Sequence, residues 1–317
     1  MFIKNAFLII KENGFKKFCV AAYYRMLIMF YNIIPLKRFV KRSIYDYQMY
    51  LDVKDAGISR SLLLHAEREL DHKLMLEEIV KPGMNIFDIG ANIGYYVLME
   101  KKLLKGQGSV TAIEPSPTNT DLLKKNMSLN NVSDVSVYTM AISNKIEKKD
   151  FYLAKQSNLN TFHATGTGAT HLSGKVISVD TATVPSLAEQ LAIKPDLIRM
   201  DVEGHEVEVI DGMLDAIKEN KLKPAIIFET HLTRYTEDHD FAKVLEKLFS
   251  QGYKTKIVSS SSERGTQVIN GLGYQSYRSV ASDNVVRDLY KDIRDEDAIS
   301  LICKTGGVRT VYLECVE

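Results

Sequence analysis

Short apolar runs alternate with longer stretches of helical periodicity along most of the chain. Seven runs have the length and composition of strands: NIFDI (85–89), SVTAIE (109–114), VSVYTMAI (135–142), DLIRMDV (196–202), AIIFET (225–230), YKTKIV (253–258) and VRTVYLECV (308–316). Strands that are separated by helices form a parallel sheet with helices on both faces. The pattern therefore predicts an α/β fold with a Rossmann-like, doubly wound, mostly parallel seven-stranded sheet. The last strand follows a long excursion and could join antiparallel.

Helical periodicity predicts helices between these strands, over residues 65–80, 95–105, 116–130, 207–217 and 240–250. Ser116 and Pro117 are typical of a helix start, because Ser accepts a hydrogen bond at the N-cap and Pro suits the first helical position. Ahead of them, residues 44–64 predict a short strand or a hairpin with a turn at residues 55–57.

Two long segments interrupt the alternation and are predicted to be insertions, near residues 147–185 and 259–300. The first holds the run SNLNTFHATGTGATHLSG between β-like runs, and the second begins SSSSERGTQ and continues through a charged, helix-like run. Loops of this length in a compact domain are usually functional or lack regular structure. We place both insertions in one domain, residues 44–317, which follows a basic amphipathic helical extension, residues 1–43.

Composition narrows the class of protein. The 317 residues are 45% hydrophobic and 26% charged, with a formal net charge of +1, as in an ordinary globular protein. A charge this close to zero gives no general attraction to nucleic acid, and we expect no nucleic-acid partner. The three cysteines have no paired spacing, which favours a reducing compartment and neither disulfides nor a zinc site. We expect a cytoplasmic protein, either free or peripheral at a membrane.

The charge is concentrated at the N-terminus. Residues 1–42 carry only Glu12 against these basic residues: Lys4, Lys11, Lys16, Lys17, Arg25, Lys37, Arg38, Lys41 and Arg42. Aromatic residues are interleaved with them, and Arg25 interrupts the most apolar stretch, 18–35, which is too short and too charged to span a bilayer. Two interpretations remain open. The segment lies in a membrane interface, or it packs on the domain or on a second subunit of a homo-oligomer.

The ends of the first two predicted strands have the chemistry of a nucleotide-like site. Ligands of open α/β sheets bind beyond the carboxyl ends of the strands. The first strand leads into Asp88-Ile89-Gly90-Ala91-Asn92-Ile93-Gly94, where the glycines allow close approach of the backbone. Glu114 ends the second strand, where a carboxylate can accept hydrogen bonds from a ribose. The spacing is not that of a dinucleotide fingerprint, and Asp88 suits an ammonium group.

Three stretches in this order, DIGANIGYY, AIEPSP and DLIRMDVEGHEVEVIDGM, resemble the FkbM family of class I S-adenosylmethionine-dependent methyltransferases, over about residues 50–235. The resemblance implies S-adenosylmethionine as the cofactor. It implies that Asp88, Gly90, Asn92 and Gly94 surround the methionine part, that Glu114 holds the ribose, that Ser116 and Asn119 lie near the adenosine, and that Ala141 and Ile142 lie near the adenine. A helix that carries Glu67 and Arg68 would cover the methionine end.

Methyl transfer to a hydroxyl gains from a base close to the acceptor. We expect that base at the end of the fourth or fifth strand, among Asp201, Glu203, His205, Glu229 and His231. Asp201 is expected to face the cofactor or orient its ammonium group, and His205 to lie on the solvent side of the next helix. Glu203 points into the pocket or is a carboxylate favoured by the helix N-terminus.

Glu229 and His231 lie on the same side of their strand, because side chains alternate along it. Glu229 could therefore orient His231 as a general base, although His231 could also be a structural strand-end residue. We take His231 and Glu203 as the catalytic candidates without choosing between them.

Other histidines give weaker patterns. His65, Glu69 and His72 share one face of a predicted helix and could ligate a metal, but no further ligand motif accompanies them, and no metal is expected. His163 and His171 flank the Gly- and Thr-rich run and could touch substrate or be solvated. The chain contains no Pro-Pro dipeptide and no Pro-Cys pair, which leaves transfer to oxygen as the expected reaction.

These observations predict an O-methyltransferase that acts on a hydroxyl of a sugar or glycan, including a lipid-linked one, or of a secondary metabolite. Two alternatives remain. The first is an RNA methyltransferase, which predicts a basic groove. The second is a non-catalytic S-adenosylmethionine-binding scaffold protein that keeps the fold without turnover.

Overall fold

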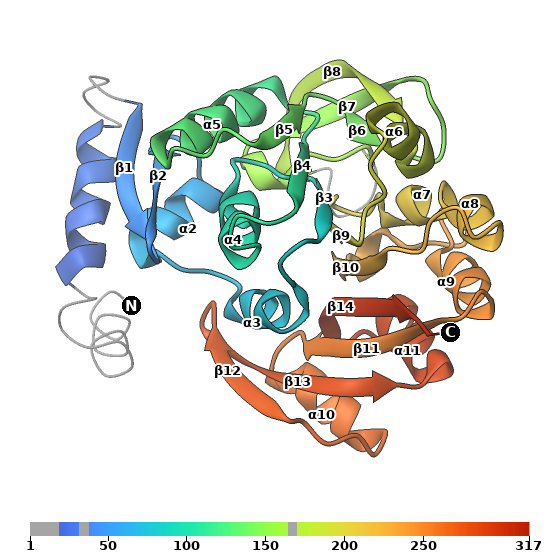
Figure 1. The fold of residues 1–317 in the computed structure, drawn as a ribbon. Helices are drawn as coiled ribbons and strands as arrows, with labels where there is room; N and C mark the ends of the chain where they lie inside the picture. Colours follow the sequence, from blue (N-terminus) through green and yellow to red (C-terminus); the bar gives the residue numbers. More distant parts are fainter. Residues whose placement is uncertain (1–18, 32–37, 164–169, 317) are drawn as a thin grey trace.

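The computed structural model describes residues 19–31, 38–163 and 170–316. Residues 19–31 are helical, so the predicted N-terminal helix is present (Figure 1). Part of the predicted extension lies outside the described residues, including Phe2, Lys4, Phe7, Lys11, Glu12, Lys16, Lys17, Phe18 and Lys37. Residues 164–169 of the first predicted insertion lie outside them as well.

A twisted nine-stranded sheet forms the centre of the molecule (Figure 1). Its order is β12 (Arg278–Ser282), β13 (Val285–Ile293), β11 (Tyr253–Ser260), β14 (Val308–Cys315), β10 (Ala225–Glu229), β9 (Leu197–Met200), β3 (Asn85–Ile89), β4 (Ser109–Ile113) and β5 (Val135–Tyr138). The strands from β10 to β5 are parallel, and β14 is antiparallel to both of its neighbours. The mostly parallel sheet and its antiparallel last strand are confirmed, and each of the seven predicted runs contributes a strand to it, but the sheet has nine strands and not seven.

Helices cover both faces of the sheet. On one face lie α2 (Ile58–His65), α3 (Leu70–Ile79), α4 (Tyr95–Leu103) and α5 (Pro117–Leu129). On the other lie α6 (Val184–Leu191), α7 (Glu206–Asp211), α8 (Leu214–Lys218), α9 (Phe241–Ser250), α10 (Glu263–Gly271) and α11 (Asp295–Cys303). The strands supply both cores because their side chains alternate: in β10, Ile226 and Phe228 join one core and Ile227 the other.

The second insertion differs from its prediction. Residues 259–300 were expected to be helix-like, but β12 and β13 form a hairpin between α10 and α11 and extend the sheet beyond β11. The run RSVASDNVVRDLYKDI places a turn, Asp283–Asn284, between two β-branched stretches, and both turn residues adopt positive φ. A turn of this composition is typical of a short hairpin. The strands were not predicted because charged residues interrupt the apolar pattern of this run.

The segment before β3 also differs. The expected helix over 65–80 is wrong in its start, because α2 ends at His65 and α3 begins at Leu70. Ala66 and Glu69, between them, adopt φ values of +60° and +51°, which break the helix. The hairpin is formed by β1 (Phe39–Ile44) and β2 (Tyr47–Asp52), earlier than the expected turn at 55–57.

A smaller sheet adjoins the carboxyl ends of the central strands. The third predicted strand splits into β5 and β6 (Ala141–Ile142), and β6 pairs with β8 (Leu172–Ala182), which pairs with β7 (Lys148–Ala154). A short 3-10 turn, η1 (Ser157–Leu159), follows β7. The expected helix over 207–217 likewise splits into α7 and α8. The first insertion therefore contributes β-structure beside the edge where the strands end.

One buried amide connects the N-terminal hairpin to the body. Asn126 of α5 accepts a hydrogen bond from the Tyr50 backbone N–H at 2.7 Å and donates one to the Ile93 carbonyl oxygen at 2.9 Å. The hairpin and the loop that enters α4 are therefore held to the same helix.

Candidate functional site

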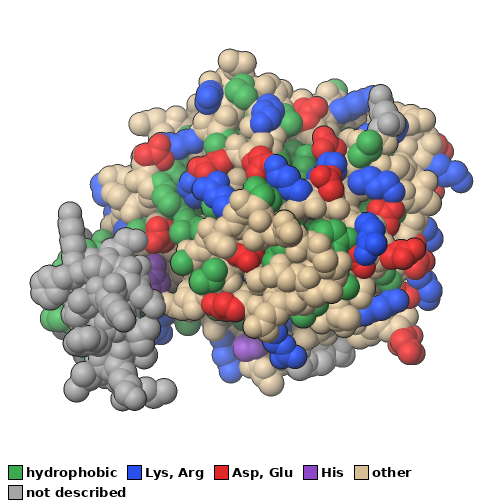
Figure 2. All heavy atoms as spheres, turned by 90° about the horizontal axis from the view of Figure 1, so that it is seen from below, with side chains coloured by type: hydrophobic (Ala, Val, Ile, Leu, Met, Phe, Trp, Pro, Cys, Tyr) green, Lys and Arg blue, Asp and Glu red, His purple; other side chains and the backbone are tan. Residues whose placement is uncertain are grey.

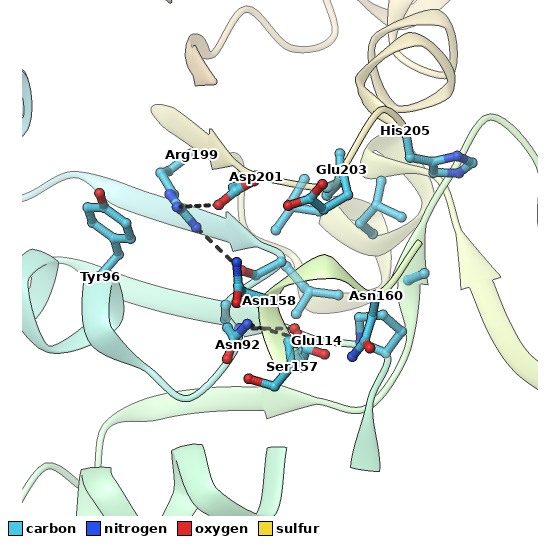
Figure 3. A pocket seen from close by; sticks show the side chains of 18 of the residues that line it. Asn92, Tyr96, Glu114, Ser157, Asn158, Asn160, Arg199, Asp201, Glu203 and His205 are labelled. Carbon is cyan, nitrogen blue, oxygen red and sulfur yellow. Dashed lines mark hydrogen bonds and ion pairs between the residues drawn. The ribbon is translucent and has the colours of Figure 1, made fainter. Parts of the chain in front are cut away.

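A cleft opens at the carboxyl ends of β3, β4 and β9, where an open α/β sheet binds its ligands (Figure 3). Its empty volume is about 770 Å³, including the space that opens to solvent. The wall is built from segments 89–96, 113–115, 140–142, 151–162 and 199–205, with Ile58, Arg68 and Glu69. The predicted strand ends therefore meet at one place.

The turn after β3 brings the backbone to the cleft. Gly90 has a φ of +79°, and a Cβ on it would lie 2.1 Å from the Asp201 carbonyl oxygen. Gly94 has a φ of +86° and precedes α4. Asn92 between them has a φ of +49°, and its buried Oδ1 has no hydrogen-bond partner. Only glycine fits at position 90, because both the space and the backbone conformation exclude a side chain.

Glu114 is the centre of a hydrogen-bond network at the end of β4. Its carboxylate accepts from the backbone N–H groups of Asn92 and Ser116, both at 2.9 Å, and from the Asn119 amide at 3.2 Å. Burial raises the pKa of Glu114 to about 7, although these donors favour its charged form. A carboxylate has about four acceptor positions, so one remains for a ligand hydroxyl.

The other residues expected to bind the cofactor fall into two groups. Ala141 and Ile142 line the cleft. Ser116 instead caps α5, and the Asn119 amide donates a hydrogen bond to Glu114. Ser116 and Asn119, which were expected near the adenosine, are therefore not wall residues of the cleft. Glu67 lies in the break between α2 and α3, and the wall residues there are its neighbours Arg68 and Glu69.

A buried ion pair lies beneath the cleft. Asp88, fully buried, accepts a hydrogen bond from Arg199 Nη1 at 3.0 Å, and Arg199 also lies 3.6 Å from the Asp201 carboxylate. The guanidinium stacks over the Tyr96 ring at 4.0 Å. Burial raises the pKa of Asp88, and Arg199 opposes that shift. Arg199 and Asp201 line the cleft, but Asp88 does not, so Asp88 acts on it through Arg199.

Three carboxylates surround His231 at the ends of β9 and β10. His231 Nδ1 lies 2.9 Å from Glu206, and Nε2 lies 3.7 Å from both Asp201 and Glu203. Burial disfavours the charged form of the ring and lowers its pKa. The negative charges of Glu206 and Glu203 outweigh this effect and raise the pKa of His231 well above its usual value. Burial also raises the pKa of Glu203, to about 7. Asp201 and Glu203 lie side by side on the wall (Figure 3), and His231 is not one of the wall residues.

Two expectations about this cluster are wrong. Glu229 does not orient His231: it pairs with Arg309 at 2.8 Å, and Glu206 takes its place. His205 is not on a solvent face: it is 1% exposed and lines the cleft. Strand alternation gave Glu229 as the partner, but the chain leaves the strand at Glu229 and His231 adopts a non-strand conformation.

The patterns did not point to Arg199, Glu206 or Arg309. Arg199 interrupts the apolar run of β9, and a charge in a buried strand is rare unless it is paired. The sequence could therefore have indicated a buried partner for Arg199, which is Asp88, the residue in register with it on β3. Arg309 on β14 pairs with both Glu69 and Glu229. Its partners are far apart in sequence, so no local pattern reveals them.

The donor set of the cleft fits S-adenosylmethionine. The ligand carries an ammonium group, a sulfonium and ribose hydroxyls, which require acceptors and negative charge. The wall offers Glu114, Asp201 and Glu203, and buried oxygen atoms of Asn92 and Asn158 have no hydrogen-bond partner. Gly90 gives room for close approach, and Ala141 and Ile142 give an apolar surface for a base.

Comparison with known proteins agrees with this chemistry. Residues 88–255 match the family described as the methyltransferase FkbM domain. The chain is 26% identical over 192 residues to the hexuronic acid methyltransferase AglP of Haloferax volcanii, covering 53% of this chain and 73% of that protein.

Solved structures of methyltransferases match this chain at low identity. A methyltransferase FkbM structure from Methylobacillus flagellatus has 18% identity and a TM-score of 0.36, covering 73% of this chain and 52% of that one, so this chain spans about half its length. M. jannaschii TYW2 in complex with AdoMet has 13% identity and a TM-score of 0.39, covering 88% of both chains. The strand order observed here, rather than these low scores, establishes the fold.

The turn at Gly90 gives a direct test of the cleft. Gly90→Ala would force its Cβ against the Asp201 backbone, so the β3 turn must move. We expect the affinity for S-adenosylmethionine, measured by calorimetry, to fall by about tenfold or more, which is about 1.4 kcal/mol.

Gly106→Ala is the matched control. Gly106 has a φ of +78°, nearly that of Gly90, but a Cβ there meets nothing within 4 Å. Both variants therefore carry the same cost of a positive φ. Equal affinities in the two variants would show that the turn does not bind the cofactor.

Proposed function

The chain belongs to the FkbM methyltransferase family and is an S-adenosylmethionine-dependent methyltransferase, and we propose that it transfers the methyl group to a hydroxyl oxygen of a sugar or glycan. The observation that carries the proposal is Glu203, whose largely buried carboxylate, 16% exposed, lies on the cleft wall beside Asp201. Similarity to a hexuronic acid methyltransferase supports a carbohydrate acceptor.

The residues that would hold the cofactor are Glu114, the Gly90 turn, Ala141 and Asp201. When bound, S-adenosylmethionine supplies an electrophilic methyl group on a sulfonium. The carboxylates Asp201 and Glu203 give this wall negative charge, which favours a cationic ligand. Arg199 forms an ion pair with Asp201 at 3.6 Å and so positions its carboxylate.

Glu203 is the base in this proposal. It faces the cleft, and burial beside Asp201 and Glu206 makes its carboxylate more basic than an exposed one. The environment of His231 favours its protonated form, so it does not suit a base. Its ring is held as a cation by Glu206 and is not on the wall, and a protonated imidazole cannot accept a proton. His231 therefore positions the two carboxylates in this assignment.

The remaining wall has the chemistry of a sugar site. The rings of Phe151 and Phe162 lie with centroids 4.8 Å apart, and Asn158 and Asn160 lie on the same wall. Aromatic faces suit the apolar faces of a sugar ring, and amides donate to and accept from hydroxyls. Asn158 Oδ1 is buried without a partner, so it is available to such a ligand.

The charge distribution gives no support to an RNA acceptor. Lys and Arg side chains alternate with Asp and Glu on the face seen in Figure 2, and the whole chain has a net charge of +1. Strong electrostatic binding of nucleic acid requires a basic surface.

The N-terminal helix supports a further part of the proposal, that the acceptor is presented at a membrane surface. Residues 19–31 expose Tyr23 (59%), Met26 (71%), Met29 (65%) and Phe30 (50%), a large apolar surface for one short helix. Amphipathic helices of this kind lie in the interface and do not span it. Within the described part of the chain, no helix is long and apolar enough to cross a bilayer.

Methyl transfer gives the test of the function. With methyl-labelled cofactor and a panel of saccharides, including hexuronic acids, we expect label on a saccharide oxygen. Glu203→Gln should lower kcat by about 100-fold or more and lower cofactor affinity much less, by about tenfold at most, because Asp201 and Glu114 keep their charges. Glu246→Gln, an exposed carboxylate on α9, should leave kcat unchanged.

Label on nitrogen or on RNA would contradict the acceptor class, and so would no transfer despite cofactor binding. If His231→Ala abolishes turnover and Glu203→Gln does not, the base is His231.

Vesicle flotation tests the membrane part. The full chain should float with vesicles that contain anionic lipid, and Met26→Glu with Met29→Glu should abolish flotation, because two charges would have to enter the interface. The matched control is Ile146→Glu with Val176→Glu, two exposed apolar residues outside the helix. Flotation that survives the helix pair, or that the control pair abolishes equally, refutes this assignment.

A further inference from the structure

A group of histidines that the proposed transfer does not use lies beside the cleft wall. His163 follows η1, His205 precedes α7, and Glu208 lies within α7. One ligand atom from each of these three residues lies within 4.8 Å of the other two. His239, from the loop before α9, adds a fourth ring: its Nε2 lies 3.0 Å from Glu208 Oε2. Segments far apart in sequence thus bring imidazole nitrogens to one carboxylate.

The outer nitrogens of two rings are already occupied. His239 Nδ1 lies 2.9 Å from the Arg234 carbonyl oxygen, an acceptor, so this nitrogen must carry a proton. His205 Nε2 lies 3.1 Å from the Ser143 hydroxyl. In metal sites a ligating histidine is held in this way through its other nitrogen, which orients the ring and sets the tautomer. The inner nitrogens, His239 Nε2 and His205 Nδ1, both face Glu208.

His239 Nε2 is hydrogen-bonded to Glu208, but two other nitrogen atoms near this carboxylate have no hydrogen bond. His205 Nδ1 is 3.1 Å from Glu208 Oε2 but forms no hydrogen bond, in a residue that is 1% exposed. His163 Nε2 is also buried without a partner. Buried polar atoms are almost always satisfied, so two unsatisfied nitrogens beside one carboxylate indicate a missing partner. A metal ion would satisfy them, because it accepts lone pairs from nitrogen and balances the charge of a carboxylate.

We propose that His163, His205 and Glu208 bind a divalent first-row transition-metal ion, with His239 hydrogen-bonded to Glu208 beside the site. Imidazole and carboxylate are the ligands of Zn²⁺ sites of the two-His, one-Glu kind. Magnesium and calcium prefer oxygen ligands, so this donor set excludes them.

The site would join three segments next to the cleft. It connects the residues after η1 and the loop before α9 to the start of α7. The His205 ring packs on Phe162 of the wall, with centroids 4.5 Å apart, so the ion would fix the position of that wall residue. The ion therefore has a positioning role, and its binding can be measured without any acceptor.

Cobalt titration of the full chain tests the site. Protein purified in the presence of a chelator should bind one Co²⁺ per chain with visible d–d absorption, and Zn²⁺ should displace it. His163→Ala and Glu208→Gln should each weaken binding by about tenfold or more. His171→Ala is the matched control, because His171 is an exposed histidine of the same insertion, and it should bind like the parent protein.

The variants also separate this site from the other metal-like group, Asp201, Glu203 and His231. Loss of Co²⁺ binding in His231→Ala but not in His163→Ala would refute the proposal, and so would the absence of saturable binding. Circular dichroism of each variant shows that it is folded. Because His163 lies in a loop, its variant remains informative if Glu208→Gln does not fold. Failure of the sugar assay leaves this measurement unaffected.

Discussion

The buried pair of Arg199 and Asp88 is the interaction on which the cleft depends. It joins β9 to β3 at 3.0 Å, and neither side chain is more than 3% exposed. Removing one partner would leave an uncompensated buried charge, which is strongly destabilising. Arg199 also contacts the Gly90 carbonyl, the Asp201 carboxylate and the Tyr96 ring. One guanidinium thus positions the glycine turn, an acidic residue of the wall and the start of α4.

The charges around this pair explain the chemistry of the wall. Carboxylates outnumber cations at the ends of β4 and β9, where Glu114, Asp201 and Glu203 line the cleft with Arg199. Burial raises the pKa of Glu114 and of Glu203 to about 7, and a cationic ligand in the cleft would favour their charged forms. Charge also determines the state of His231. Glu206 favours the cationic form of its ring, which lies 3.7 Å from the wall carboxylates Asp201 and Glu203. In the histidine group next to it, nitrogen atoms of His205 and His239 face a single carboxylate, Glu208.

Local patterns predicted the parts of the structure that local physics determines. The parallel strands, the Ser116 cap and the glycine turn follow from periodicity and backbone conformation, and Glu114 follows from its place at a strand end. The β12–β13 hairpin, the break at 66–69 and the Glu206–His231 contact do not, because each depends on contacts between segments distant in sequence. His205 shows the limit most clearly. Its helix position indicated solvent, but the first insertion folds over it and buries it against Phe162.

The central claim is that one edge of the sheet holds the cofactor. Hydrogen–deuterium exchange of the full chain, with and without S-adenosylmethionine, tests it most directly, because protection reports where backbone amides become ordered. The account predicts protection over residues 88–96, 113–119 and 140–142, and over 157–162 and 199–205, the segments that form the cleft and the Glu114 network. Protection confined to other segments, with S-adenosylmethionine bound, would contradict it.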